Sequence, residues 1–431
     1  CKLDGNRDVA SLTINTGATI DGSGAKLSIK SEGDSSEGTN HFAVNNDGRI
    51  VGNLDLEINT PATTSCDFAG EAGHGKFRNV TINHASCQVN LESTTQFTGD
   101  LTITLGKIVC GGNTVEITGH TEIGPASGAA DQATLQCDAS AMYLGSGHTS
   151  SHALIVNQGG TFVGGSGNHT VGSIDVKNNS NAKCTLTSGN TTVDSEKTGD
   201  DRNIVIASSS TFAHGSGTII TTFAGTTHMD VDKTLNNLTI NDASAVHKLS
   251  DSIDLAGNLT ITAGEFQPNG RNLTVTGKTT IGPNSGAADQ ATLTCSSGNM
   301  SLGSTKTDGL GLHVQQGGTF VGGSGTHTMG SLAVDNNAAA KFTNTSGTNT
   351  LNGHSNDSVR VIIGGANSTC TAAGTMEITY AGGGYNLQNG NIAMINNLTF
   401  NSNVTANLSA ATSITGNLTI SQGTLTTTAS N

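Results

Sequence analysis

The strongest constraint on the fold of this chain is a long internal repeat. Residues 101–193 align without a gap onto residues 259–351, and 53 of these 93 positions are identical. The best-preserved blocks are TEIGP at 121–125 with TTIGP at 279–283, each followed one residue later by SGAADQATL, and GGTFVGGSG at 159–167 and 317–325. A fixed offset of this kind, from 101 to 259, is typical of an architecture in which each unit stacks on the next.

Weaker similarity extends the repeat on both sides of these blocks. The segment GNLTI at 257 returns at 416, and GDLTI at 99 occupies the matching place upstream. We therefore predict four parts: a degenerate N-terminal module, two repeat modules and the start of a further module, at 1–100, 101–258, 259–417 and 418–431. Because the chain stops soon after a module begins and does not start with methionine, we expect a section of a longer protein.

The composition excludes several classes of protein. Glycine accounts for 58 of 431 residues, proline for 4, tryptophan is absent, and charged residues make up only 12%. This argues against a coiled coil, and no run of eighteen apolar residues is present that could span a membrane. Abundant Thr, Val and Ile argue against disorder, and a net charge of −14 disfavours binding to nucleic acid.

Hydrophobic residues within a module alternate with polar ones, which predicts short β-strands. Examples are Leu259-Thr-Ile261, Leu273-Thr-Val275 and Met376-Glu-Ile378, each cut off by Gly, Asn or Ser. A sandwich or barrel would need longer strands joined by hairpins. We predict an all-β chain that forms a parallel β-helix (β-solenoid) from modules of about 158 residues, with about twenty residues per coil and about eight coils per module.

Asparagine and glycine support stacked coils. Asparagine pairs recur beside strands, where they either form turns or ladder along the stack, at 178–179, 236–237, 336–337 and 396–397. Glycine pairs allow sharp turns where a Cβ would clash, at 159–160, 164–165, 317–318 and 322–323. The GGSG blocks resemble calcium-binding rolls, but Asn168-His169 and Thr326-His327 stand where an aspartate is needed, so no metal site is predicted.

Two cysteines that form a disulfide are expected to be present or absent together in each module, and the eight cysteines of this chain do not follow that pattern. Cys110 aligns with Pro268 and Cys184 with Phe342, whereas Cys137 and Cys295 are equivalent. A position that accepts either Cys or Phe is a buried apolar slot, so we expect mostly free core thiols, as in a chain that folds in a reducing cytosol. Without a CxxC spacing there is no support for a zinc site.

One acidic stretch is a candidate for acid–base chemistry: Asp194, Glu196, Asp200 and Asp201. Paired carboxylates of this kind cleave glycosidic bonds. The next module has Asn352, Gly353, Asp357 and Ser358 at the same places, and sugar-cleaving grooves normally offer aromatic platforms, whereas this chain has no Trp and three Tyr. We therefore interpret the stretch as a solvated loop with a possible role in ion binding, and predict no enzyme, no catalytic residue and no cofactor.

Two further pairs of polar residues are equivalent in the two modules. His169 and His327 are expected to be hydrogen-bonded histidines in stacked turns. Asp131-Gln132 and Asp289-Gln290 follow SGAA and are expected in coil-corner turns, with a two-copy binding site as the alternative.

The order of blocks GNLTI, GPxSGAADQATLxC, GGTFVGGSGTHTMGSL and AKxTxTSG resembles repeat segments of long virion structural proteins of tailed bacteriophages, of the tail-fibre or adhesin-like kind. The resemblance covers most of residues 80–420, and residues 1–79 fit it poorly. It implies a β-helical shaft, usually trimeric, that is displayed on the virion surface and used for attachment to a host. It supplies no catalytic residue.

We expect a non-enzymatic extracellular fibre that associates with itself and with other virion proteins, with a host glycan or receptor as a further partner. A bacterial cell-surface adhesin or matrix filament is the first alternative, and Cys1 at the start of the chain would suit a processed lipoprotein. The second alternative is a tailspike-type polysaccharide depolymerase with its groove along the solenoid.

Overall fold

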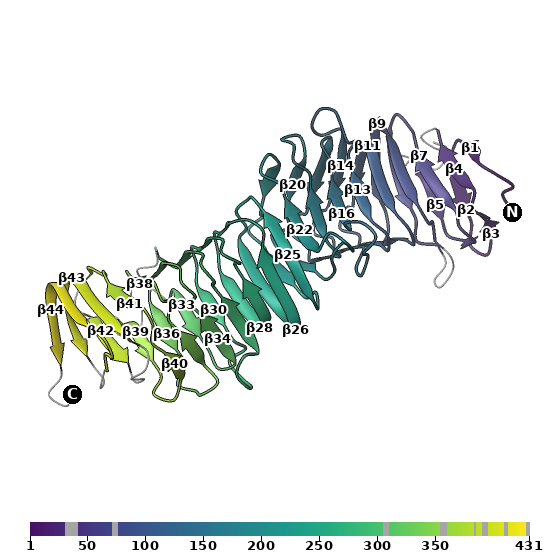
Figure 1. Cartoon of the computed structure of the whole chain (residues 1–431). Coiled ribbons are helices and arrows are strands. Elements are labelled where there is room, and N and C mark those ends of the chain that lie inside the picture. The colour runs from purple at the N-terminus through teal and green to yellow at the C-terminus, as the bar shows by residue number, and fades with distance from the viewer. Residues whose placement is uncertain are drawn as a thin grey trace. The chain divides into compact units, whose positions relative to one another are not determined.

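The computed structural model describes residues 1–30, 42–70, 76–304, 310–353, 360–382, 385–389, 395–408 and 413–427. Within these ranges the chain contains strands and no helix, and hence no helix that could cross a membrane. Two compact units are present, Cys1–Ile219 and Ile220–Asn431, and in each of them parallel strands follow one another rung by rung (Figure 1). The predicted all-β parallel β-solenoid is confirmed.

In unit 1 (Cys1–Ile219) each coil contributes one short strand to each of three columns. Column A contains β13 (Thr121–Ile123), β16 (Leu154–Val156), β19 (Ile174–Val176) and β22 (Arg202–Ile206). Column B contains β14 (Ala133–Gln136), β17 (Gly160–Val163), β20 (Lys183–Thr185) and β23 (Thr211–Ala213). Column C contains β10 (Thr95–Phe97), β12 (Val115–Ile117), β15 (Met142–Leu144), β18 (His169–Val171) and β21 (Asn190–Val193).

Two long strands, β9 (Val80–Leu91) and β11 (Leu101–Val109), run through columns A and B without a break. Their pairing shifts register midway, where the strand turns the corner between the columns. Gly106 occupies that corner with φ +100°, and a Cβ there would lie 2.6 Å from the carbonyl oxygen of His84. Gly264 repeats the arrangement in unit 2 with φ +87°.

The N-terminal residues that fit the repeat poorly still form coils. One series pairs β1 (Arg7–Val9), β4 (Lys26–Ile29) and β7 (Asp55–Ile58) up to β9. A second pairs β2 (Leu12–Ile14), β5 (Phe42–Asn46) and β8 (Thr63–Asp67) up to β9, and a third joins β3 (Thr19–Asp21) to β6 (Arg49–Val51). The solenoid therefore includes the degenerate first module.

Unit 2 (Ile220–Asn431) has the same columns. Column A contains the first half of β28 (Leu259–Gln267), β30 (Thr279–Ile281), β33 (Leu312–Val314), β36 (Leu332–Val334) and β39 (Arg360–Gly364). Column B contains the second half of β28, β31 (Ala291–Thr294), β34 (Gly318–Val321), β37 (Lys341–Thr343) and β40 (Thr369–Thr371). Column C contains β27 (Ile253–Leu255), β29 (Leu273–Val275), β32 (Met300–Leu302), β35 (His327–Met329), β38 (Thr348–Leu351) and β41 (Thr375–Ile378).

The columns of unit 2 change places at its later strands. The long strand β43 (Asn397–Leu408) pairs through its first half with β41 of column C, and through its second half with β42 (Tyr385–Asn389), which continues column A. The next strand, β44 (Leu418–Thr427), follows both halves of β43. The remaining strands of this unit, β25 (Thr226–Val231) and β26 (Asn237–Leu249), pair with each other, and β26 pairs with β28.

The coils are unequal in length, and several are longer than predicted. Leu101 pairs with Thr121, which matches the expected step, but Thr121 pairs with Leu154, which is a much longer step. Unit 2 repeats both steps, from Leu259 to Thr279 and from Thr279 to Leu312. The prediction of about twenty residues per coil holds for some coils and not for others, so about eight coils per module is too many, because corner loops add residues that the strand pattern does not reveal.

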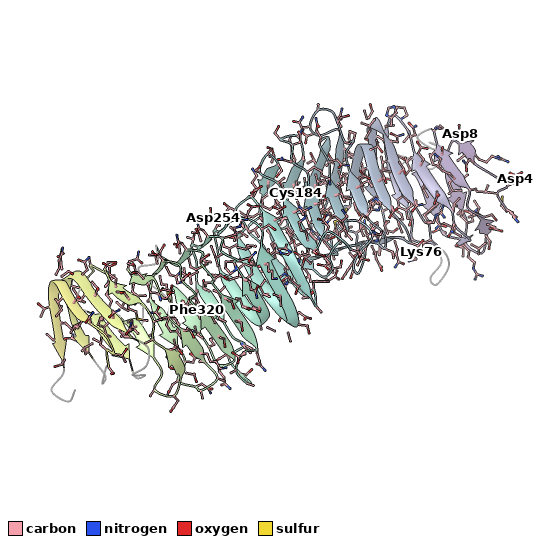
Figure 2. All side chains as sticks on the ribbon, viewed as in Figure 1. Asp4, Asp8, Lys76, Cys184, Asp254 and Phe320 are labelled. Atoms are coloured by element: carbon pink, nitrogen blue, oxygen red, sulfur yellow. The ribbon has the colours of Figure 1, made fainter. Side chains whose placement is uncertain are left out.

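The interior is a stack of like side chains. In column B of unit 1, Phe162, Cys184 and Phe212 are paired in successive coils, and in unit 2 the equivalent order is Phe320, Phe342 and Cys370. Cys184 and Phe320, labelled in Figure 2, are 1% and 0% exposed. The expected exchange of Cys and Phe in one buried slot is therefore confirmed, and all eight cysteines are free thiols.

The asparagine pairs have two roles, and the structure contains examples of both predicted roles, turn formation and laddering between coils. The side-chain oxygen of Asn178 accepts a hydrogen bond from the backbone N–H of Ser209 in the next coil, at 3.1 Å, and Asn336 does the same for Asn367, at 2.8 Å. Their neighbours Asn179 and Asn337 instead close turns by accepting from the N–H two residues ahead. In these two pairs the first asparagine ladders and the second forms the turn, whereas in the other two pairs the second asparagine, Asn237 or Asn397, accepts from the next coil.

Glycine is required where coils approach most closely. Gly165 and Gly323 have φ near +66°, and a Cβ would lie 1.9 Å from the oxygen of Asp138 and 1.8 Å from that of Ser296. No side chain fits at such a distance from backbone. The steric role predicted for the glycine pairs is confirmed.

Candidate functional site

Unit 1 carries two long corner loops that pack against each other. Residues 145–153 connect β15 to β16, and residues 194–201 connect β21 to β22; the coil between them turns at Gly172 and Ser173 alone. The N–H of Thr198 donates to the oxygen of Thr149 at 2.8 Å, and the hydroxyl of Ser195 donates to the oxygen of His148 at 3.2 Å. We call these two segments the loop pair.

A buried histidine connects the two loops to a group of ion pairs. His152, 4% exposed, places Nε2 3.5 Å from Oδ2 of Asp200 and 4.0 Å from Oδ2 of Asp175. Burial lowers the pKa of His152, and the two carboxylates oppose that effect. Three cations face the same carboxylates: Lys177 pairs with Asp175, and Lys197 and Arg202 pair with Asp200.

The acidic stretch predicted from sequence lies in this loop pair, but two of its carboxylates, those of Asp194 and Asp200, already have hydrogen-bond or ion-pair partners. Burial tends to raise the pKa of Asp200, yet Arg202 and Lys197 hold it below the ordinary value overall. Asp194 accepts hydrogen bonds from the hydroxyl of Ser146 and the N–H of Gly147. A general acid at neutral pH needs a raised pKa, so these ion pairs do not prepare Asp200 for that role. Of the counterparts, Asn352 and Gly353 pair with the preceding coil through their N–H groups, and Asp357 and Ser358 lie outside the described residues.

A second polar cluster lies beside the loop pair on the outer face of column A. Nδ1 of His120 is 2.9 Å from Asp100, and Asn157 donates to Glu122 at 2.6 Å. The carboxylates of Glu122 and Asp100 raise the pKa of His120, although burial acts against them. Sequence analysis missed His120, His148 and His152, and the available signal was their absence from the second module, where Lys278, Lys306 and Leu310 occupy the same places.

Unit 2 has a different cluster on the same face. Nε2 of His313 is 2.8 Å from Oδ1 of Asp335, and its Nδ1 is 3.0 Å from Nζ of Lys278. In unit 1 these three positions are Ile155, Lys177 and His120. The two modules therefore present different charges from equivalent strands.

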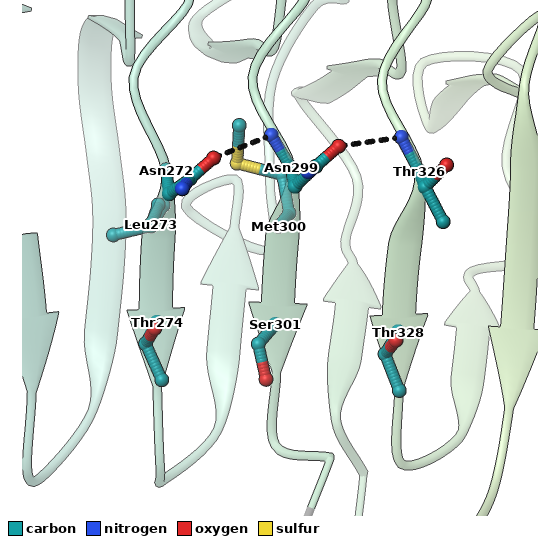
Figure 3. A pocket seen from close by; sticks show the side chains of 8 residues that line it. All are labelled: Asn272, Leu273, Thr274, Asn299, Met300, Ser301, Thr326 and Thr328. Carbon is teal, nitrogen blue, oxygen red and sulfur yellow. Dashed lines mark hydrogen bonds between the residues drawn. The ribbon is translucent and has the colours of Figure 1, made fainter. Parts of the chain in front are cut away.

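Column C of unit 2 is hollowed into a shallow groove of about 300 Å³ without a charged side chain (Figure 3). Asn272 accepts from the N–H of Asn299 at 3.1 Å, and Asn299 accepts from the N–H of Thr326 at 2.9 Å. These ladder bonds fix the direction of both amides. The groove is completed by Leu273, Thr274, Met300, Ser301 and Thr328.

The remaining polar candidates are engaged in structural contacts. Asp131 lies in a corner loop and accepts from Thr161 at 2.6 Å and from Lys183; Asp289 repeats these contacts with Thr319 and Lys341. The predicted corner turns are therefore confirmed. His169 and His327 are buried, and each places Nε2 on a glycine oxygen of its own coil, at 2.7 and 2.6 Å, so the expected hydrogen bonds are present. Both are the first residues of strands, β18 and β35, so the prediction that they lie in turns was wrong.

The clusters lack the composition of a metal centre. Across the described ranges, no group of three or more His, Cys, Asp or Glu side chains is arranged to hold a metal ion. Comparison with protein-family models, with curated proteins and with solved structures gave no match. Fold and surface together define a parallel β-solenoid whose repeated coils carry different polar clusters on their outer faces.

Proposed function

We propose that this chain is part of a non-enzymatic extracellular fibre, a virion tail fibre or appendage that supports attachment to a host surface. The observation that carries the proposal is the coil-to-coil bonding. Backbone pairing joins successive coils along columns A, B and C, and side chains such as Asn178, Asn336 and Asn299 add a bond between coils. A chain bonded in this way resists bending and stretching.

The repeated module supplies length in this proposal. Strands β12 and β29, β15 and β32, and β18 and β35 begin at equivalent positions of the two modules, so a further copy of the module would add further coils to the solenoid. The outer clusters are free to differ between copies because they do not enter the core. Association into a trimer follows from the resemblance to phage fibres.

Labelling of the source particle tests the location. Antibodies against this chain, imaged by electron microscopy, should decorate an appendage of a virion. Decoration of a bacterial envelope instead would favour the adhesin or matrix filament. Sedimentation equilibrium tests the oligomer, and a stable folded monomer would contradict the trimer.

A depolymerase remains the enzymatic alternative, and the paired state of Asp200 argues against it. Purified protein should leave host capsular polysaccharide at its original length in size-exclusion chromatography. Shortening that disappears in the Asp200→Ala/Asp201→Ala variant, but persists in an Asp131→Ala control, would establish the enzyme and overturn the fibre proposal.

A further inference from the structure

Two buried cysteines of unit 1 face each other in successive coils. Cys110 directly follows β11 and Cys137 directly follows β14, and these strands are paired so that Val109 lies beside Gln136. The N–H of Cys110 donates to the oxygen of Gln136 at 3.0 Å, which fixes the register up to the two cysteines. Both are buried, at 0% and 1% exposure, and the register of β11 and β14, continued by one residue, places Cys110 beside Cys137.

Unit 2 offers a natural control for this pair. Cys295 occupies the place of Cys137, but its neighbour in the preceding coil is Pro268 in place of Cys110. Cys184 and Cys370 are flanked in their column by phenylalanine rings. Cys66 pairs in register with Leu91, so its strand partner is not Cys87.

We propose that Cys110 and Cys137 form a disulfide between two coils when the chain folds in an oxidising medium. Neighbouring strands lie about 4.8 Å apart, which is within the Cα separations that a disulfide spans. With a small-molecule disulfide such as oxidised glutathione as oxidant, one thiolate attacks it and releases one reduced glutathione. The second cysteine then displaces another reduced glutathione from the mixed disulfide, so two thiols lose two protons and two electrons to the oxidant.

The bond forms during folding and scarcely at all afterwards. Thiolate is the attacking species, and the neighbouring thiol of Cys110 together with burial raises the pKa of Cys137 well above its ordinary value. In the closed coil the thiols are also screened from a solvent-borne oxidant. Folded reduced protein should therefore keep both thiols for much longer than protein that refolds in the presence of oxidant.

The redox state of Cys110 and Cys137 then indicates the compartment in which the chain folded. A virion protein that folds in a reducing cytosol would carry free thiols, and an exported adhesin that folds in an oxidising compartment would carry the disulfide. This consequence separates the two leading functions, whereas the disulfide chemistry depends on neither of them.

The test is refolding followed by peptide mapping. The full chain is denatured with reductant, refolded in a mixture of oxidised and reduced glutathione, alkylated with iodoacetamide and digested for mass spectrometry. We expect a linked peptide pair that contains Cys110 and Cys137, while Cys295 is alkylated. Thermal denaturation of the same sample should occur at a higher temperature than after reduction, and a Cys110→Ala variant should show no such difference.

Refolded protein with native circular dichroism in which Cys110 and Cys137 are alkylated as fully as Cys295 would overturn the proposal. So would a disulfide that joins either residue to another cysteine or to a second chain. Because the mapping is made on the unmodified chain, a variant that fails to fold does not affect the result.

Discussion

The coils at 101–193 in unit 1 and at 259–351 in unit 2 have equivalent strands, yet they differ far more on their outer faces than inside. In column A the buried residues are the same or similar: Ile123 and Ile281, Leu154 and Leu312, Val156 and Val314, Val176 and Val334. The outward residues beside them are unlike: Glu122 and Thr280, Ile155 and His313, Lys177 and Asp335. Stacking restricts each inner residue from two sides, whereas an outer residue meets water and can change its charge.

The largest expected effect on stability concerns the glycines at which successive coils approach most closely, and it should be the same in both modules. Gly165→Ala and Gly323→Ala should each destabilise the fold by about 4 kcal/mol, because the new Cβ would overlap backbone oxygen. Urea denaturation followed by circular dichroism measures the loss.

Gly147→Ala is the matched control, with φ +73° and no atom within 4 Å of the new Cβ. It should cost only about 1–2 kcal/mol, the strain of the left-handed backbone alone. Equal effects at all three glycines would show that backbone conformation, and not coil packing, selects glycine in both modules.

The next largest effect is a difference between the two units in how their stability depends on pH. His247 of unit 2 is fully buried, its ring nitrogens lack hydrogen-bond partners, and burial lowers its pKa to about 4; Val89 stands at the same place in unit 1. Between pH 6.5 and 4, His247 binds a proton in the unfolded chain but not in the folded chain. The free energy of unfolding of unit 2 should therefore fall by about 3 kcal/mol as pH falls through this window.

Denaturation midpoints at pH 7 and pH 4 measure this loss, and His247→Val should reduce the difference. The other buried histidines, His152, His169 and His327, remain in that variant and supply the background. An unchanged pH response in His247→Val would rule out His247 as its source.

A smaller effect concerns the order of side chains in column B. Phe342→Cys should destabilise unit 2 by about 2–3 kcal/mol, because the ring stacks on Phe320 with centroids 5.3 Å apart. Adding Cys370→Phe recreates the order found in unit 1 and should recover most of the loss. If the double variant is no more stable than the single one, the two modules do not share an interchangeable core.

The smallest effect is that of one ladder bond. Asn258 accepts from the N–H of Lys278 at 2.8 Å, as Asp100 accepts from His120 in unit 1 at 2.9 Å. Asn258→Ala should cost about 1 kcal/mol, and Asn258→Asp, which keeps the acceptor, clearly less. Equal losses in the two variants, measured by urea denaturation, would remove the ladder as a source of stability.

The fold was predictable because stacking imposes a local pattern. Three sequence features each reflect packing between neighbouring coils: the alternation at Leu259–Ile261, the paired glycines at 164–165, and the exchange of Cys184 for Phe342. Coil length was not predictable, because the corner loops between Ile123 and Leu154, which flank β14 and β15, obey no period. The segment 1–79 fits the repeat poorly, and yet its described residues, 1–30, 42–70 and 76–79, form the same kind of coil, since the solenoid needs apolar residues facing inward and not a particular sequence.

The outer clusters escaped prediction for a different reason. His152 and Asp200 are distant in the chain and meet only because two corner loops pack across an intervening tight turn. The spacing of these residues along the sequence does not indicate such a contact. The acidic stretch was located correctly, but its pairing with Arg202 and Lys197 depends on how the loop folds back.

Pairing between successive coils also has a consequence for how the chain acquires its structure. Each strand finds its partner one coil away along the chain, as Leu101 finds Thr121 and Thr121 finds Leu154, so a finished coil offers a ready template to the segment that follows it. Folding can then advance in one direction from a single nucleus while the rest of the chain is still being synthesised, with a loop-closure cost that does not grow with total length. A defect in one coil would halt that advance there and leave the earlier coils intact.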